Sequence, residues 1–215
     1  MEYTAKSYIT VEEELETETV VKKSRFIARV FPVSSEEQIA DILEQTKKKY
    51  WDARHNCYGY VLGLKGEKQK CSDDGEPAKT AGAPIMEVLK NENLTFTLAV
   101  VTRYFGGVLL GTGGLTRAYS SAVAEAIALG KELGAVKQKR LCYRTGIKAD
   151  YGLAGKLKYI FNEEEILIED EIYTDLVSYG IAVPVDKLEV LNKKITEVTN
   201  GKLVIDINED MVVYL

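Results

Sequence analysis

The chain has little of what builds a disulfide framework or a metal cluster. Its 215 residues include three cysteines and one histidine. The cysteines, Cys57, Cys71 and Cys142, lie far apart and form no CxxC pair. An odd, unclustered set of this kind favours a reducing compartment and argues against structural zinc.

The chain also lacks long apolar runs and an excess of positive charge. No apolar run approaches the roughly 18 residues that a membrane span needs, so we expect no membrane partner. Residues 1–18 are acidic without an apolar signal core, which predicts a cytoplasmic protein rather than a secreted one. Lys and Arg number 28 against 33 Asp and Glu, a formal net charge of −5. Any site for a polyanion must therefore be a local basic patch.

What remains is an ordinary globular composition, 46% hydrophobic and 28% charged, long enough for one large or two small domains. A basic segment at 136–140 follows a long predicted helix. We place a domain boundary there, which gives domains at 1–136 and 140–215.

The stretch from Arg103 to Ile127 is the most informative in the chain. An apolar run at 96–102 precedes it and predicts a strand. The stretch then contains five glycines: Gly106, Gly107, Gly111, Gly113 and Gly114. After them, apolar residues recur at helical spacing, at Leu115, Ala118, Tyr119, Ala122, Val123, Ala126 and Ile127.

A glycine-rich loop before a helix suggests an anion site, because a helix N-terminus presents free N–H groups and the positive end of its dipole. Arg103 and Arg117 bracket the loop, and Tyr104 and Phe105 could stack on bases if exposed. The alternative is that the glycines only let the helix pack closely on a sheet. Tyr119 lies on the apolar stripe, so we expect it in the core.

The segment at 71–84 reads as a long polar loop rich in turn residues. Within it, Asp73, Asp74 and Glu76 could hold a hard cation such as Mg²⁺. The same residue types are also ordinary turn chemistry, which we favour, so no metal is predicted. Lys79 and Thr80 follow and could contact phosphate.

A third candidate is the run from Arg54 to Cys57. His55 and Cys57 are two residues apart on a predicted strand and would share a face, as a Cys/His nucleophile requires. No acyl-transfer motif accompanies them, so we expect a buried Cys57. Arg54 and His55 would then lie at the surface and join Arg103 and Arg117 in one basic patch.

The coarse element pattern is α+β. Early strands are predicted at 5–11, 16–22 and 26–33, with Ser24-Arg25 separating the last two. After residue 140 the order is βαββαβ, the ferredoxin-like arrangement. Its strands are predicted at 141–148, 166–173, 176–183 and 202–215, and its helices at 151–161 and 185–199. The first of these helices carries an exposed basic and aromatic edge, with Tyr151, Lys156, Lys158 and Tyr159, suited to RNA or to solvent; we favour solvent.

Four blocks together resemble the bacterial branch of the IMPACT family. They are SRFIA (24–28), ARHNCYGY (53–60), SDDGEPAKTAGAPI (72–85) and RYFGGVLLGTGGLTRAYSSA (103–122). The resemblance covers nearly the whole chain. Gly59, Ala78-Lys79 and Thr112 depart from the family pattern without removing a polar residue.

The resemblance implies that the first domain is similar to domain IV of elongation factor G, a ribosomal-protein-like or GHMP-kinase-like two-layer fold. It implies that the second is similar to domain V of the same factor. A eukaryotic relative dampens a starvation-sensing kinase with the help of a further N-terminal domain, so that partner does not transfer directly.

Two functional hypotheses follow. The first is a non-enzymatic regulator linked to translation or stress response, which binds RNA, the ribosome or a protein partner through the glycine-rich, arginine-flanked surface. The second is a Mg²⁺-dependent enzyme or binder acting on a phosphorylated small molecule or nucleotide. We expect no catalytic residue and no cofactor, and the oligomeric state stays open.

Overall fold

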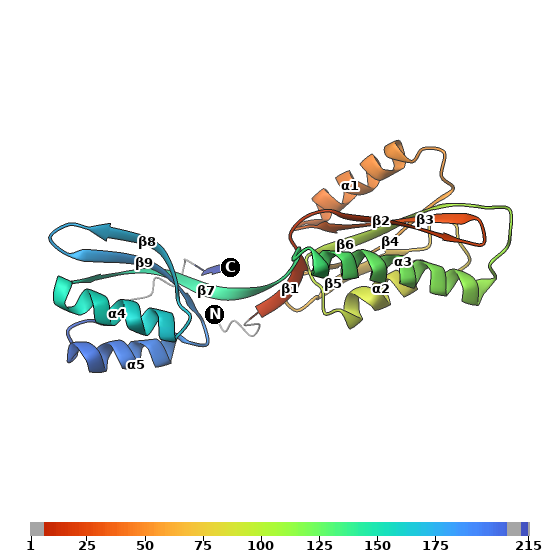
Figure 1. The fold of residues 1–215 in the computed structure, drawn as a ribbon. Coiled ribbons are helices and arrows are strands. Elements are labelled where there is room, and N and C mark those ends of the chain that lie inside the picture. The colour runs from red at the N-terminus through yellow and green to blue at the C-terminus, as the bar shows by residue number, and fades with distance from the viewer. Residues whose placement is uncertain (1–6, 206–211, 215) are drawn as a thin grey trace. The chain divides into compact units, whose positions relative to one another are not determined.

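A computed structural model of the chain describes residues 7–205 and 212–214. It is an α+β protein whose chain divides into two compact units, meeting between Gln138 and Lys139. Each unit has its own sheet and helices (Figure 1). Among the described residues, no helix has the length and apolar character needed to cross a bilayer.

The first unit is built on a five-stranded sheet in the order β2-β3-β6-β4-β5, with neighbouring strands antiparallel. Its central strand β6 is buried from Thr97 to Arg103 because it has partners on both edges and helices on both faces. The strands are β2 (Leu15–Val21), β3 (Ser24–Pro32), β4 (His55–Leu62), β5 (Lys68–Ser72) and β6 (Thr97–Tyr104).

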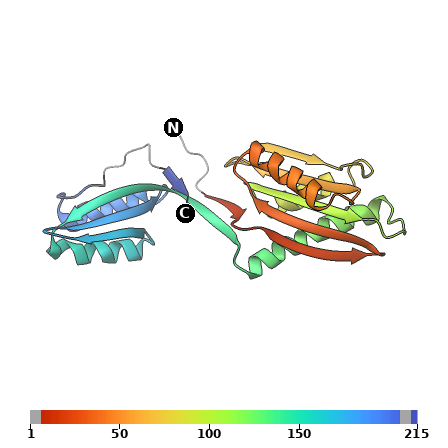
Figure 2. The ribbon, with the colours of Figure 1, turned by 90° about the horizontal axis from the view of Figure 1, so that it is seen from above.

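Helices cover both faces of this sheet. Ala99 and Val101 of β6 face a core closed by α2 (Gly82–Asn91) and α3 (Thr112–Glu132). The alternate residues Leu98 and Val100 face a smaller core beneath α1 (Glu36–Lys49), which lies across the opposite face (Figure 2). The predicted two-layer arrangement is therefore wrong: the unit has three layers, because β3 and β6 are apolar on both faces.

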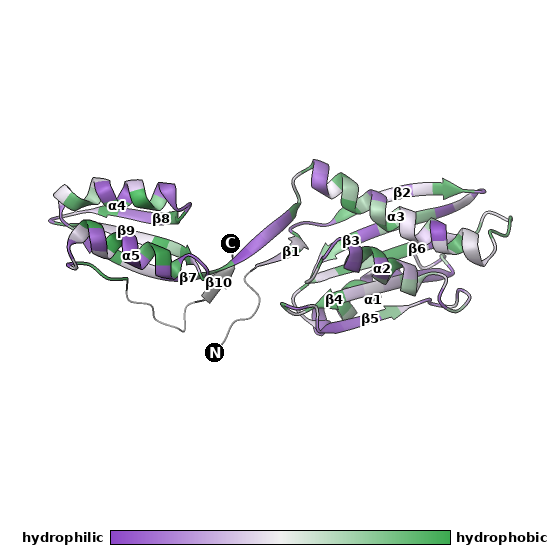
Figure 3. Ribbon diagram, turned by 90° about the horizontal axis from the view of Figure 1, so that it is seen from below, coloured by the Kyte–Doolittle hydropathy of each residue, from purple (hydrophilic) through white to green (hydrophobic). Residues whose placement is uncertain are grey.

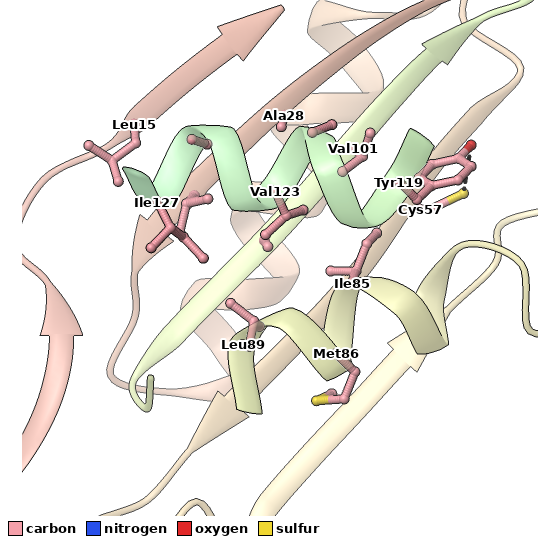
Figure 4. Close-up of a cluster of buried hydrophobic side chains, with 14 of the residues drawn as sticks. Leu15, Ala28, Cys57, Ile85, Met86, Leu89, Val101, Tyr119, Val123 and Ile127 are labelled. Carbon is pink, nitrogen blue, oxygen red and sulfur yellow. Dashed lines mark hydrogen bonds between the residues drawn. The ribbon is translucent and has the colours of Figure 1, made fainter. Parts of the chain in front are cut away.

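The predicted stripe of α3 is confirmed, since all seven of its apolar residues are buried. Figure 4 shows Tyr119, Val123 and Ile127 of this stripe pointing into the core against the residues of α2. Tyr119 is fully buried, as predicted.

Two details of the strands differ from the prediction. The turn between β2 and β3 is Lys22-Lys23, and Ser24-Arg25 begins β3 instead of separating it from β2. The segment at 68–72 forms strand β5, although the sequence placed residues 71 and 72 in a long loop. KQKCS carries no apolar alternation because β5 is an exposed edge strand, so periodicity could not reveal it.

The second unit has the predicted order βαββαβ, with the strands hydrogen-bonded in the order β10-β7-β9-β8. β1 (Ser7–Val11) pairs with β7, but its Ile9 and Val11 pack in the core of the first unit. The core of the second unit is a separate cluster that includes Leu157, Phe161 and Ile195. The elements are β7 (Val136–Ala149), α4 (Tyr151–Glu163), β8 (Leu167–Tyr173), β9 (Val177–Pro184), α5 (Leu188–Thr199) and β10 (Val212–Tyr214).

The proposed boundary at 136–140 falls within the first residues of β7, so the chain passes between the units as an extended strand. This part of β7 is hydrophilic (Figure 3). Residues 5–6 of the first predicted strand, and residues 206–211 and 215 of the last, lie outside the described residues.

Candidate binding site at one end of the first sheet

The four sequence blocks meet at one end of the first sheet. There β4 begins and β6 ends, with His55 opposite Arg103. The β2–β3 turn lies at the same end, because Arg25 of β3 is opposite Tyr104 of β6. The loop after β5, residues 73–81, starts there too. The antiparallel sheet thus brings together segments that are 80 residues apart.

A buried polar network lies beneath this end. Oε1 of Glu76 accepts one hydrogen bond from Nη1 of Arg103 at 2.6 Å and another from the hydroxyl of Tyr119 at 2.7 Å. The side chains of Arg103 and Glu76 are only 6% and 3% exposed. Burial raises the pKa of Tyr119, so it remains a neutral donor. The prediction of Arg103 as a surface contact for phosphate is wrong, since Arg103 is half of a buried ion pair.

The guanidinium of Arg103 is enclosed by aromatic rings. Its carbon lies 5.4 Å from the ring centre of Phe26 and 5.6 Å from that of Phe105. Nη2 is 3.4 Å from the hydroxyl of Ser24, and Nε is buried without a hydrogen-bond partner among the described residues. Arg103 therefore holds together the segments at this end of the sheet through buried contacts.

The two aspartates of the loop hold backbone rather than metal. The carboxylate of Asp73 accepts N–H bonds from Lys79, Ala81 and Gly82 at 2.8, 3.0 and 2.8 Å. Burial works against its ionisation, but these bonds outweigh it and lower the pKa of Asp73. Asp74 accepts the N–H of Asn56 at 2.7 Å.

These carboxylates do not form a ligand set. Asp73, Asp74 and Glu76 each have separate partners, and no group of three or more His, Cys, Asp or Glu residues in the described chain is placed to hold a metal ion. Thr80 is buried against the carbonyl of Pro77, and Lys79 is exposed. The hydrogen bonds of these residues thus hold the turns of the loop.

Cys57 is buried, as predicted, and its environment is that of a core thiol. It donates to the carbonyl of Asp73 at 2.9 Å and lies 3.4 Å from the hydroxyl of Tyr119. Burial raises the pKa of Cys57 to about 12, so almost no reactive thiolate forms near neutral pH. His55 is half-buried, with Nδ1 2.8 Å from the carbonyl of Asp74, and Arg54 is exposed.

The five glycines serve different purposes. A Cβ on Gly106 would lie 2.0 Å from the carbonyl carbon of Lys23, so this position requires close packing. Gly107 and Gly111 have φ of +81° and +73°, which L side chains adopt at a cost. Gly114 lies against Leu110. Gly113 has open space around it and no such φ, so neither packing nor conformation explains it.

A hollow of about 410 Å³ opens above the network, and we name it the first hollow. It contains the start of α3, where no side chain caps the helix. Phe105 and Leu109 at its rim are 49% and 82% exposed. Its lining comprises Arg54, His55, Glu76, Pro77, Arg103, Phe105, Leu109, Leu110, Gly111, Thr112 and Leu115.

A neighbouring hollow of about 390 Å³ lies between the β2–β3 turn and α3, and we name it the second hollow. Leu110 lines both hollows. Arg117 lines the second and not the first, so the single patch predicted for Arg54, His55, Arg103 and Arg117 is divided between two hollows. The lining of the second hollow comprises Thr19, Val20, Val21, Lys22, Leu110, Gly114, Arg117, Ala118, Ser121 and Glu125.

Several residues at this end of the sheet were not predicted to belong to the site. The exposed apolar residues Val108 and Leu109 stand in the glycine-rich loop, and Lys22 and Lys23 form the nearby turn. The signal for the turn was present, since two lysines separate two strand-like runs. Five of the predicted phosphate contacts line neither hollow: Gly106, Gly107, Gly113, Lys79 and Thr80.

Comparison with known proteins identifies the family of both parts of the chain. The Impact N-terminal domain matches residues 22–127, and a domain of unknown function (DUF1949) matches residues 147–202. The chain is 42% identical to the IMPACT family member YvyE of Bacillus subtilis over 97% of this chain and 94% of that protein. It is 32% identical to the IMPACT family member YigZ of Escherichia coli, over 85% and 89% of the two chains.

A crystal structure of a hypothetical protein matches 95% of this chain and 98% of its own, with a TM-score of 0.58 and 27% identity. That structure supports the fold across both units. The matches to both domains and to nearly full-length relatives show that this chain belongs to the IMPACT family.

Proposed function

We propose that the chain is a non-enzymatic, translation-linked binding protein that contacts RNA through the end of its first sheet. One observation carries this proposal. The first hollow combines an exposed aromatic ring, Phe105, with the cation Arg54 and an uncapped helix start at Gly111 and Thr112. Ring stacking together with phosphate contact is the chemistry that holds unpaired nucleotides.

The electrostatics of the hollow are consistent with an anionic ligand. Glu76 is its one carboxylate among the lining residues, and that charge is already paired with Arg103. The net charge of −5 therefore does not determine the local field. The family resemblance supports the same role, because it relates the two domains to domains IV and V of elongation factor G.

A Mg²⁺-dependent enzyme has less support. The carboxylates that would hold the ion are engaged with backbone and side-chain donors, and the one candidate nucleophile, Cys57, has a raised pKa. A protein partner at the exposed Val108 and Leu109 would replace RNA if the test below fails.

The test is fluorescence anisotropy of a labelled oligouridylate with the full-length protein, over a salt series. Arg103 is unsuitable for substitution because it is buried, so the variant is Arg54→Ser with Phe105→Leu, which keeps an apolar cover over Arg103. We expect affinity to fall about tenfold, since one stacked base contributes roughly 1–3 kcal/mol.

The matched control removes a cation and a ring elsewhere. Lys156→Ser with Tyr159→Leu does so on the exposed edge of α4. We expect this control to bind like the wild type. A control that loses affinity while the hollow variant keeps it would move the site to α4, and a wild type that binds no RNA at low salt would refute the proposal.

A further inference from the structure

The turn between β2 and β3 has an unusual composition for its geometry. Val21 pairs with Ser24, so the hairpin loop is the two residues Lys22 and Lys23. Both have positive φ, 45° and 68°. This is the type I′ geometry, which favours Asn-Gly because side-chain-bearing residues are strained there. Asn-Gly at these two positions would therefore stabilise the hairpin better than the two lysines do.

These lysines are unpaired cations. Both are exposed, and among the described residues neither forms an ion pair. Arg25, the next cation along, is by contrast bonded to Glu18 at 2.9 and 2.8 Å. The backbone strain thus coincides with two charges that have no structural use within the unit.

The turn is joined to the glycine-rich loop. Gly106 lies so close to Lys23 that a side chain would collide with it, and the N–H of Gly106 bonds to the hydroxyl of Ser24 at 3.2 Å. Lys22 and Arg117 line the second hollow, which meets the first at Leu110. The end of the sheet thus presents cations on both sides of Leu110: Arg54 in the first hollow, Lys22 and Arg117 in the second. Glu125 also lines the second hollow.

We infer that Lys22, Lys23 and Arg117 form a phosphate-contacting track that continues the first hollow, and that its ligand is a single RNA strand. This inference rests on the proposed function. A single strand fits better than a duplex, because a base must leave any helix to stack on Phe105 while its neighbouring phosphates cross Leu110 to the lysines. The charge of the second hollow favours an anionic occupant such as phosphate, because two cations, Lys22 and Arg117, outnumber the one carboxylate, Glu125.

The test replaces the two lysines of the turn with Asn-Gly, the pair that this turn geometry prefers. Lys22→Asn with Lys23→Gly removes both charges and also relieves the strain, so the variant should fold at least as well as the wild type. A purely structural role for this turn predicts unchanged RNA binding and a raised melting temperature. The inferred track predicts weaker RNA binding with that same raised or unchanged melting temperature.

The control removes two lysines away from the β2–β3 turn, one beyond the far end of β4 and one in the middle of the edge strand β5. Lys65 lies in the β4–β5 turn and Lys70 on β5, and both are exposed. Lys65→Asn with Lys70→Gln changes the net charge by the same amount, and we expect it to bind like the wild type. A control that weakens binding as much as the turn variant would reduce the effect to overall charge and overturn the inference.

The readout is the slope of log affinity against log salt for labelled oligouridylate, with the same strand annealed to oligoadenylate as the duplex arm. Two lost phosphate contacts should reduce the slope by about 1.4 on the single strand. An unchanged slope, or tighter binding of the duplex, would overturn the track while leaving the first hollow in place. Loss of binding in Arg54→Ser/Phe105→Leu alone would support the proposed function without the track. A wild-type protein that binds neither the single strand nor the duplex would refute both the proposed function and the track.

Discussion

At the scale of single residues, the distinctive side chains of this chain divide into two groups. Arg103, Glu76 and Tyr119 form the buried network, in which Oε1 of Glu76 joins the loop to Arg103 of β6 and to Tyr119 of α3. Arg54 and Phe105 stand above the network and face solvent. Two arginines at the same end of the sheet therefore have opposite uses, since Arg103 is internal and Arg54 is external.

Glu76→Gln should destabilise the first unit by about 3–5 kcal/mol, because it leaves the buried guanidinium of Arg103 without its counter-charge. Tyr119→Phe should cost less, about 1.5–3 kcal/mol, since it removes one bond to a charged group. Urea unfolding measures both. Adding Arg103→Met to Glu76→Gln should recover part of the loss. If Glu76→Gln is as stable as the wild type, the buried network does not stabilise the first unit.

At the scale of elements, the loop between β6 and α3 combines tight packing with an open surface. Gly106 is packed against the backbone of the β2–β3 turn, whereas Gly113, in the first turn of α3, has nothing near it. The two glycines look equivalent in the sequence, but only the packing around them distinguishes their purposes.

Gly106→Ala should lower the melting temperature, because its Cβ would lie 2.0 Å from the carbonyl carbon of Lys23 and force the loop away from the turn. Gly113→Ala should raise stability by up to about 1 kcal/mol, as alanine is the better helix former. Thermal unfolding followed by circular dichroism compares the pair. Equal effects of the two substitutions would contradict the assignment of their purposes.

At the scale of the whole molecule, the described residues form separate hydrophobic cores in the two units: two clusters, one on each face of the sheet, in the first unit and one in the second. The residues of the candidate site all belong to the first unit. The formal net charge of the whole chain, −5, opposes long-range attraction of polyanions, so recognition depends on the local cations at the end of the first sheet.

Because the cores are separate, calorimetry of the full-length protein should resolve two unfolding transitions. Glu76→Gln should lower the temperature of one and leave the other in place. Ala154→Ser, a buried change on α4, is the reciprocal control and should lower the other. One transition that shifts as a whole in both variants would show that the units unfold together.

The sequence by itself determined the elements that have strong periodicity. The stripe of α3, the burial of Tyr119 and Cys57, and the βαββαβ order after residue 140 all follow from local pattern. The sequence did not reveal β5, because an exposed edge strand carries no apolar alternation. The β2–β3 turn was predicted at Ser24-Arg25, although the two lysines before it already separate the strand-like runs.

Only the tertiary structure decided which polar residues are internal. Arg103 and Arg117 are 14 residues apart and alike in the sequence, yet one is sealed between Phe26, Phe105 and Glu76 and the other is exposed. The tertiary structure also decided the place of Lys22 and Lys23, because the pairing of β3 with β6 brings them beside the glycine-rich loop. Burial and pairing depend on contacts between distant segments, and the antiparallel register of β3, β4 and β6 sets those contacts.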